Sequence, residues 1–289
     1  MSIHHGTVAA RCNRIVIALT GSLALLTMQS AGAFSVFPLD AGHSLKWGDN
    51  ANGTPGGTIT WGFISAGTSG SADYCGTACP GSSLDAINIE NSPGTGYTLT
   101  PLASLQSTIE SAMAQWAAAA NISLVGPQAD SGLAINDGAA ITPDIRIGVF
   151  AFSAGGGAVG YAPPPNGGTG AGDILFDANS FYAFQPGSDG DLFPVESTAP
   201  NDFESLLLHE LGHALGLAHP SGVDAVCQVM DVSPVCLGRI NRVLDADDIA
   251  GIQFLYGATA VPLPASVWLL SSGLGLLGLR RRRDRNHLA

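Results

Sequence analysis

Apolar residues recur at intervals of three and four between residues 102 and 120, which is the pattern of a helix that buries one face. This stripe consists of Leu102, Leu105, Ile109, Met113, Trp116 and Ala120. Thr100 and Pro101 stand directly before the stripe and suit the N-cap and the first turn of a helix. We therefore predict an amphipathic helix from Pro101 onward, and core packing accounts for its apolar face without a cofactor.

Short runs rich in β-branched and aromatic residues predict strands at 58–64 (TITWGFI) and 144–151 (DIRIGVFA). A segment rich in glycine and proline, 158–177, has the composition of a loop between two further short strands.

Two more helices follow in the second half of the chain. Asn201 and Glu204 form a candidate capping box for a helix that carries His209 and His213, and Gly216 can end it in a left-handed turn. Asp245 and Asp248 open the last helix, which continues through Ile249, Ile252 and Leu255. The order strand, helix, two strands, two helices predicts an α+β domain.

The first 33 residues have the features of a secretory signal that signal peptidase removes. Arg11 and Arg14 precede an apolar run at 15–28, and Ala31 and Ala33 supply small residues at positions −3 and −1 of a cleavage site. An N-terminal membrane helix is the alternative, but the run is shorter than the roughly 20 residues that span a bilayer.

A second apolar run lies near the C-terminus. Residues 265–279 carry no charge, four arginines follow at 280–283, and a proline motif, VPLP, precedes the run at 261–264. A helix of this length reaches about 22 Å, less than the ~30 Å hydrocarbon core, although arginine side chains can extend to the interface. The arginines favour a cytoplasmic end, with the preceding domain outside. A buried C-terminal helix is the alternative, and the adjacent arginines argue against it.

The segment VPLPASVWLLSSGLGLLGLRRRR resembles the PEP-CTERM sorting signals, with Leu263 where the namesake motif has glutamate. The resemblance implies processing by an exosortase-type enzyme in a Gram-negative cell envelope, so that insertion of the helix into the inner membrane is transient. The chain then divides into a signal peptide (1–33), a central domain (34–257) and a sorting tail (258–289) with its basic end at 280–285.

Composition places the central part among exported, loop-rich globular proteins. Only 12% of the residues are charged and 38 are glycine. Between residues 34 and 279 there are 22 acidic residues against four basic ones, which gives a formal charge of −18. Because so acidic a body repels phosphate backbones, we exclude nucleic acid as a partner.

Four cysteines remain after removal of the signal: Cys75, Cys79, Cys227 and Cys236. An even number in an oxidising compartment predicts disulfide bonds. Of the three possible pairings we favour the local one, Cys75 with Cys79 and Cys227 with Cys236, because each pair brackets a short loop. A zinc-thiolate cluster is the alternative.

The stretch HELGHALGLAH, at 209–219, is a candidate metal site. His209 and His213 lie four apart and share one face of a helix, so both imidazoles can reach one zinc ion. Gly216 permits the chain to turn, and His219 can then supply the third ligand and leave one position for water. Glu210 lies beside that position and is the candidate general base.

Chance is a poor explanation for this spacing. Its five fixed residues would occur in on the order of 10⁻⁵ random chains of this length and composition. Three of the four histidines between residues 34 and 279 lie within it, and the fourth, His43, is predicted to be an ordinary surface residue.

This motif resembles that of the metzincin metalloproteases, and the flanking sequence is similar to their matrixin-like members. The similar stretches are TITWGF, AMAQWAAAA, DIRIGVF, AVGYAPPP, GDILFD and DADDIAGIQFLYG. The resemblance implies a mixed, twisted sheet with an active-site helix and a C-terminal helix. It also implies that Met230 forms the methionine turn beneath a single catalytic zinc.

Two departures from the matrixin pattern bear on other metals. Tyr161 and Leu175 stand where matrixins have histidines for a second, structural zinc, so we expect none. Asp173 and Asp177 match positions near the family's calcium sites, and either calcium ligands or solvated loop acids would fit there.

The sequence therefore predicts an exported zinc endopeptidase whose protein or peptide substrate lies extended along an edge strand at 157–162. The loop at 180–200, including the acidic segment 188–191, is predicted to border the cleft and could bind calcium. One alternative is a non-catalytic zinc-containing protein of the envelope or extracellular matrix. Another is a protease that releases its own tail.

Overall fold

The computed structural model describes residues 34–71, 79, 81–135, 142–165, 170–220 and 227–259. The predicted signal peptide, the proline motif, the apolar run and the basic end of the tail lie outside these residues, as does Cys75. Within the described part of the chain, no helix has both the length and the apolar character needed to cross a membrane.

The described residues form an α+β domain, as the sequence predicts. Its strands are β1 (Ser35–Val36), β2 (Pro38–Asp40), β3 (His43–Ser44), β4 (Gly57–Phe63), β5 (Ala86–Glu90), β6 (Tyr97–Pro101), β7 (Ile122–Val125), β8 (Ile145–Phe150), β9 (Ala158–Gly160), β10 (Ile174–Asp177), β11 (Phe181–Ala183), β12 (Asn201–Asp202) and β13 (Leu217–Ala218). Its helices are the 3-10 turn η1 (Leu102–Leu105), α2 (Gln106–Ala119), α3 (Phe203–Ala214) and α4 (Ala246–Tyr256).

The main sheet has five strands in the order β7-β4-β8-β10-β9. Strands β7, β4, β8 and β10 run parallel, whereas β9 pairs antiparallel with β10, in the register Val159 with Leu175. The sheet is therefore mixed, as expected. Strand β8 is buried at all six positions, which explains why all of its residues except Arg146 are apolar or glycine. Among the described strands β9 pairs with β10 alone and therefore forms an edge of the sheet.

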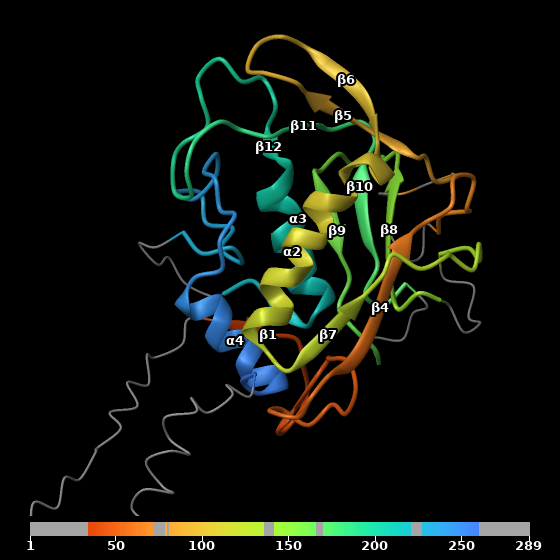
Figure 1. Cartoon of the computed structure of the whole chain (residues 1–289), viewed down its shortest axis with the longest axis vertical. Helices are drawn as coiled ribbons and strands as arrows, with labels where there is room; N and C mark the ends of the chain where they lie inside the picture. The colour runs from red at the N-terminus through yellow and green to blue at the C-terminus, as the bar shows by residue number, and fades with distance from the viewer. Residues whose placement is uncertain are drawn as a thin grey trace, which may run out of the picture. The chain divides into compact units, whose positions relative to one another are not determined.

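Helices α2 and α3 lie side by side against this sheet, with α4 beyond their lower ends (Figure 1). The indole of Trp116 on α2 donates a hydrogen bond to the Leu208 carbonyl on α3 at 3.1 Å. Ile109, Trp116 and Leu211 are fully buried where the layers meet. Packing of this kind holds α3, which carries the histidine motif, at a fixed distance from the sheet.

The predicted start of the first helix at Pro101 is wrong. Residues 97–101 instead form β6, which pairs with β5 in the register Ala86 with Pro101, and the α-helix begins only at Gln106, after the 3-10 turn. Long-range strand pairing outweighs the local helix-start signal here. The apolar stripe itself is confirmed, since all six of its residues are buried.

Smaller sheets complete the domain. Strands β12-β11-β5-β6 form a four-stranded sheet, and β2 pairs with β3. Strand β1 pairs with β13, so that Val36 lies opposite Leu217. This pairing brings residues near the start of the described chain alongside the segment that leads to His219.

Candidate metal centre and active site

Helix α3 begins one residue later than the sequence suggests. Asp202, not Asn201, is the N-cap, and its carboxylate accepts the backbone N–H of Ser205 at 3.0 Å. Asn201 lies in β12, where its side-chain amide donates to Ser180 Oγ at 3.0 Å. Glu204 pairs with Arg242 at 3.4 Å rather than closing a capping box. Both 201 and 202 are good cap residues, but the Asn201 side-chain amide is engaged by Ser180 and the Phe181 carbonyl, so the Asp202 carboxylate caps the helix.

Three histidines converge at the C-terminal part of α3. His219 Nε2 lies 3.0 Å from His209 Nε2 and 2.9 Å from His213 Nε2. His213 is buried, His209 partly buried and His219 exposed, so the group is open to solvent on one side. The structure thus brings together the three residues that the spacing predicts to bind one ion.

Gly216 turns the chain so that His219 can reach back. Its φ of 105° is in the left-handed region that favours glycine, as predicted. A Cβ at this position would also collide with the Leu45 carbonyl. The Gly216 carbonyl accepts the N–H of Phe37 at 3.1 Å, which ties the turn to the chain leading into β1 and β2.

Backbone carbonyls fix the orientation of two imidazoles. His209 Nδ1 lies 2.6 Å from the Val229 carbonyl, and His213 Nδ1 lies 2.8 Å from the Leu217 carbonyl. Because a carbonyl only accepts, each Nδ1 must carry the proton and each Nε2 presents a lone pair to the centre. Lone pairs directed at one point repel one another unless a cation lies between them. The residues therefore fit a zinc ion held by three neutral imidazoles.

Burial also keeps these imidazoles neutral. It lowers the pKa of His209 to about 4 and that of His213 to about 3, and it lowers the pKa of His219 as well. The neighbouring Asp231 carboxylate opposes the shift at His219. Neutral imidazole is the form that binds metal, so the site is ready for a cation at neutral pH.

Glu210 is buried beside the histidines, with 5% of its surface exposed. Burial raises the pKa of its carboxyl to about 8, and a hydrogen bond from the Gly160 backbone N–H acts in the opposite direction. A Cβ on Gly160 would collide with the backbone of Glu210, so glycine allows β9 to approach α3 closely. An acid whose pKa lies near neutrality is suited to general acid–base catalysis.

Met230 lies under the histidine site and is 4% exposed. A Cβ added to Gly212 of α3 would collide with its sulfur, which shows that the two residues pack in contact. Asp248 of α4 holds the Met230 segment from behind: its carboxylate accepts the N–H groups of Val229 and Met230 at 3.0 and 3.2 Å. Asp248 also completes a capping box with Asp245 at the start of α4, where the sequence predicts that the helix begins.

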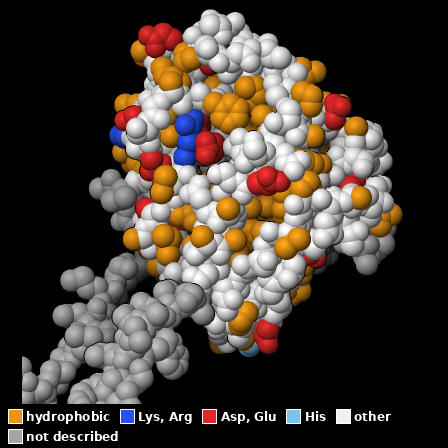
Figure 2. All heavy atoms as spheres, viewed as in Figure 1, with side chains coloured by type: hydrophobic (Ala, Val, Ile, Leu, Met, Phe, Trp, Pro, Cys, Tyr) orange, Lys and Arg blue, Asp and Glu red, His pale blue; other side chains and the backbone are white. Residues whose placement is uncertain are grey.

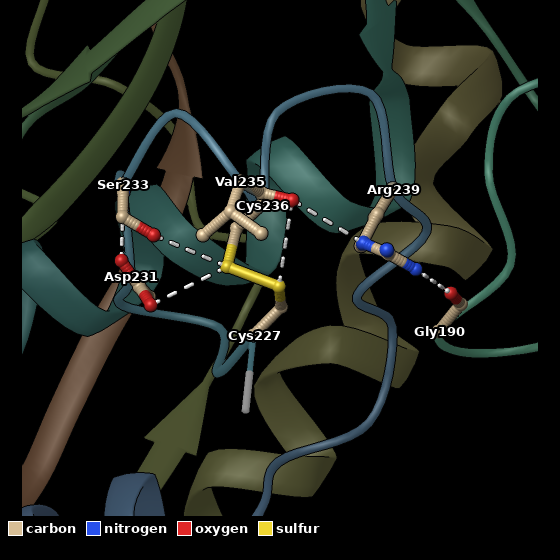
Figure 3. The surroundings of a disulfide bond; sticks show 7 residues. All are labelled: Gly190, Cys227, Asp231, Ser233, Val235, Cys236 and Arg239. Atoms are coloured by element: carbon tan, nitrogen blue, oxygen red, sulfur yellow. Dashed lines mark hydrogen bonds between the residues drawn. A yellow bond between two sulfur atoms is a disulfide. The ribbon is translucent and has the colours of Figure 1, made fainter. Parts of the chain in front are cut away.

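A disulfide between Cys227 and Cys236 closes the loop that contains Met230 (Figure 3). This confirms one of the two predicted pairs. Cys79 is also disulfide-bonded, while Cys75 lies outside the described residues. The 227–236 bond lies at the wall of the cavity described next, because Cys236 is one of the residues that line it.

A cavity of about 510 Å³ opens at the histidines. It is bounded by Val159 and Gly160 of β9 on the edge of the sheet and by Val229 and Leu237 on the disulfide-bonded side, with Phe193 also lining it. Its walls are mainly apolar. The cavity adjoins a free strand edge, and this combination can accommodate an extended peptide.

Asp173 and Asp177 do not lie in solvated loops, because both residues are buried. Arg146 donates to both oxygens of Asp173, at 3.2 and 2.7 Å, in a fully buried ion pair. Asp177 Oδ1 accepts the backbone N–H groups of Phe152 and Asn179 at 3.0 and 2.9 Å. Both carboxylates are 1% exposed. These contacts join strands and loops of the domain.

The acidic segment 188–191 also has protein partners. Asp189 accepts the backbone N–H groups of Arg242 and Val243 at 2.6 and 3.1 Å, and Asp191 accepts that of Ser188 at 2.7 Å. The 180–200 loop does border the cavity, through Phe193 and Pro200.

Several contributors to the site were not foreseen from the sequence. Gly160, Asp248 and Asp231 act through contacts with residues far away in the chain, and nothing in their local spacing indicates this. His43 is exposed and pairs with Asp40 in the β2–β3 hairpin, in keeping with the prediction of a surface residue.

A mixed sheet whose free edge adjoins a three-histidine helix site, with a buried methionine turn beneath, defines an α+β catalytic domain of metzincin type. The matrixin family profile matches residues 95–257, more than half of the chain. The chain belongs to the matrixin family.

Three relatives illustrate the extent of the similarity. Metalloendoproteinase 1 of Glycine max is 35% identical over 109 residues, which are 37% of this chain and 32% of the relative. Metalloendoproteinase 2-MMP of Arabidopsis thaliana is 32% identical over 127 residues, 40% and 30% of the two chains. Matrilysin of Rattus norvegicus is 36% identical over 126 residues, 40% and 41%. The alignments thus span about a third of the plant relatives' length.

Proposed function

We propose that this protein is an exported zinc-dependent endopeptidase. The observation that carries the proposal is the convergence of the Nε2 atoms of His209, His213 and His219 at a cavity beside the edge strand β9. Membership of the matrixin family agrees with it, as do relatives whose names describe metalloendoproteinases.

In this proposal the three histidines hold the metal and Glu210 moves the proton. Zinc, when bound, would lower the pKa of a bound water toward ~7 and polarise the carbonyl of the peptide bond. Glu210 takes a proton from the attacking water and later delivers it to the leaving amine. Its burial and its hydrogen bond from the Gly160 backbone N–H keep the carboxyl in one place beside the histidines.

Substrate would bind in an extended conformation along β9. The strand has a free side, and Val159 and Gly160 line the cavity, so a peptide could add to the sheet by main-chain hydrogen bonds. Met230 and the Cys227–Cys236 bond would keep the opposite wall in place.

A structural zinc site in a non-catalytic envelope protein is the rival function. Such a site is closed by a fourth protein ligand. Among the residues that the structure describes, the metal-ligating cluster consists of the three histidines alone. A zinc ion held by these three histidines would keep one open coordination position, which favours a catalytic over a structural zinc site.

The experiment compares Glu210→Ala with the wild-type protein. The variant should retain zinc, because its three ligands are unchanged, and lose roughly 10²–10⁴-fold in casein cleavage. Glu110→Gln on the exposed side of α2 is the matched acid-to-neutral control and should cleave normally. Undiminished cleavage by Glu210→Ala would refute the role of Glu210. The rival, a structural zinc site, would be favoured if the wild-type protein binds zinc but shows no hydrolysis that a chelator can inhibit.

Export and sorting form a second part of the proposal, supported by the sequence at the two ends. Signal peptidase would remove residues 1–33, and an exosortase-type enzyme would recognise the PEP-CTERM-like tail from 258 onward and release the domain from the inner membrane of a Gram-negative cell. Mass spectrometry of the exported protein should then find neither end. Detection of Arg283 in the mature exported protein would contradict tail removal.

A further inference from the structure

The lysine and arginine side chains of the acidic domain are distributed unevenly. Lys46 and Arg146 are buried at 1% and 0% exposure, which leaves Arg239 and Arg242 as the only solvent-accessible ones among the described residues. On the face shown in Figure 2, the few basic side chains lie toward one side, whereas acidic ones are spread over the surface.

The two arginines differ in their partners. Arg242 is neutralised by Asp202, which its Nε approaches to 2.9 Å, and by Glu204. Arg239 has no carboxylate partner among the described residues. Its Nη1 donates to the Gly190 carbonyl at 2.9 Å and its Nε to the Val235 carbonyl at 3.4 Å. Both acceptors are neutral, so no carboxylate of the described residues compensates the charge of Arg239.

The backbone on both sides of Arg239 is held in place. Ile240 exchanges hydrogen bonds with the 190–191 segment, and the N–H of Phe193 donates to the Gly238 carbonyl at 2.8 Å. Three residues before Arg239, Cys236 is fixed by the disulfide. A guanidinium on so constrained a segment loses little entropy when it binds a ligand.

Arg239 is one of the residues that line the cavity, and Asp231 is another. They lie on opposite sides of the disulfide, with Asp231 toward one end of the view and the Arg239 guanidinium toward the other (Figure 3). Asp231 influences His219 and therefore belongs to the metal end of the cavity. Arg239, on the other side of the disulfide, supplies a positive charge to the wall of the same cavity, within reach of a substrate side chain.

We propose that Arg239 is a specificity-determining residue that selects substrates with a carboxylate side chain, Asp or Glu, in the part of the peptide that lies over the 237–241 segment. This inference rests on the proposed endopeptidase function. Guanidinium presents five donors in a planar fork that matches a carboxylate, and at least two of them remain available beyond the carbonyl contacts. Substrate selection by charge also suits a domain whose remaining surface is acidic and would otherwise repel acidic peptides.

The test uses zinc-loaded protein and C-terminally amidated peptides that share one cleavable core. A single residue is varied as Glu, Gln or Lys at each of three positions on either side of the cleaved bond, and kcat/KM is measured for each peptide. At one position, wild type should prefer Glu over Gln by roughly three- to tenfold, with Lys the poorest, and added salt should reduce the preference.

Variants of Arg239 should change this ratio. Arg239→Gln should bring the Glu/Gln ratio to about one, and Arg239→Glu should reverse the order in favour of Lys. Glu110→Gln, which alters the net charge on the surface of α2, should leave the ratio unchanged. Because each ratio compares two substrates on one variant, a change in the amount of folded enzyme does not affect it.

The possible failures are distinguishable. The role of Arg239 is overturned if the wild-type protein cleaves the peptides without preferring Glu at any position. It is also overturned if the preference for Glu survives in Arg239→Gln. Failure of the wild-type protein to cleave any peptide, including the neutral ones, instead overturns the endopeptidase function on which the inference rests.

Discussion

Gly212 and Met230 pack in contact across the floor of the histidine site, and the contact leaves no room for a side chain on Gly212. A Cβ there would collide with the Met230 sulfur and approach Trp116 Cζ2 to 3.2 Å. Gly212 lies between Glu210 and His213, so the same close approach sets the height of the helix above the methionine turn. The glycine in HELGH is therefore required by packing and not by backbone conformation.

We predict that Gly212→Ala destabilises the protein by about 1–3 kcal/mol through overpacking, despite the better helix propensity of alanine. Met230→Ala removes the sulfur with which the new Cβ would collide. Gly212→Ala should therefore lower the free energy of unfolding less in the Met230→Ala variant than in the wild-type protein. Urea denaturation of the four proteins in a double-mutant cycle should give a coupling of about 0.5–3 kcal/mol. Additive effects would show that the two side chains do not share this space.

The Asp248 carboxylate gives a second prediction, because it accepts the backbone N–H groups of Val229 and Met230. Asp248→Asn replaces one acceptor by a donor that faces an N–H, and we expect a loss of about 1–3 kcal/mol in the free energy of unfolding. A lower kcat/KM with zinc content unchanged should accompany it. Asp245→Asn on the same helix is the control, since asparagine caps a helix as well as aspartate does. Equal effects of the two substitutions would contradict a specific role for Asp248.

The sequence predicts those parts of the site that depend on local spacing. His209, His213, Gly216 and His219 are placed by helix geometry and one turn, and the start of α4 at Asp245 is likewise a local signal. The start of α2 is misplaced because strand pairing between β5 and β6 extends to Pro101. The capping residue of α3 differs because the Asn201 side chain bonds to Ser180 and Phe181, which lie about twenty residues earlier in the chain. The contacts of Asp248 and the pairing of β1 with β13 join segments far apart in the chain, and no local pattern encodes them.

The buried pair of Arg146 and Asp173 predicts that calcium does not stabilise this domain through those residues. Millimolar calcium should leave the thermal unfolding midpoint unchanged. Arg146→Met should cost about 3–5 kcal/mol, because Asp173 then remains buried without a partner, and adding Asp173→Asn should recover part of this loss. Thermal melts of zinc-loaded protein with and without calcium test both points. A rise in the midpoint with calcium that disappears in Asp173→Asn would show that this carboxylate does bind the ion.

The buried carboxyl of Glu210 predicts a pH-dependent difference between wild type and Glu210→Gln in the metal-free protein. Its pKa is raised from 4.5 to about 8, chiefly by burial. A raised pKa means that folding takes up a proton between these two values, so the contribution of Glu210 to stability is fully present below about pH 4.5 and is lost as the pH rises to about 8. Glutamine does not titrate. The stability of Glu210→Gln relative to wild type should therefore increase by up to ~1.4 kcal/mol per pH unit across this interval and level off above pH 8. Urea denaturation of chelator-treated proteins from pH 5 to 9 measures the difference, with Glu110→Gln as the exposed control. A difference that does not vary with pH would show that the Glu210 carboxyl is not desolvated in the folded protein.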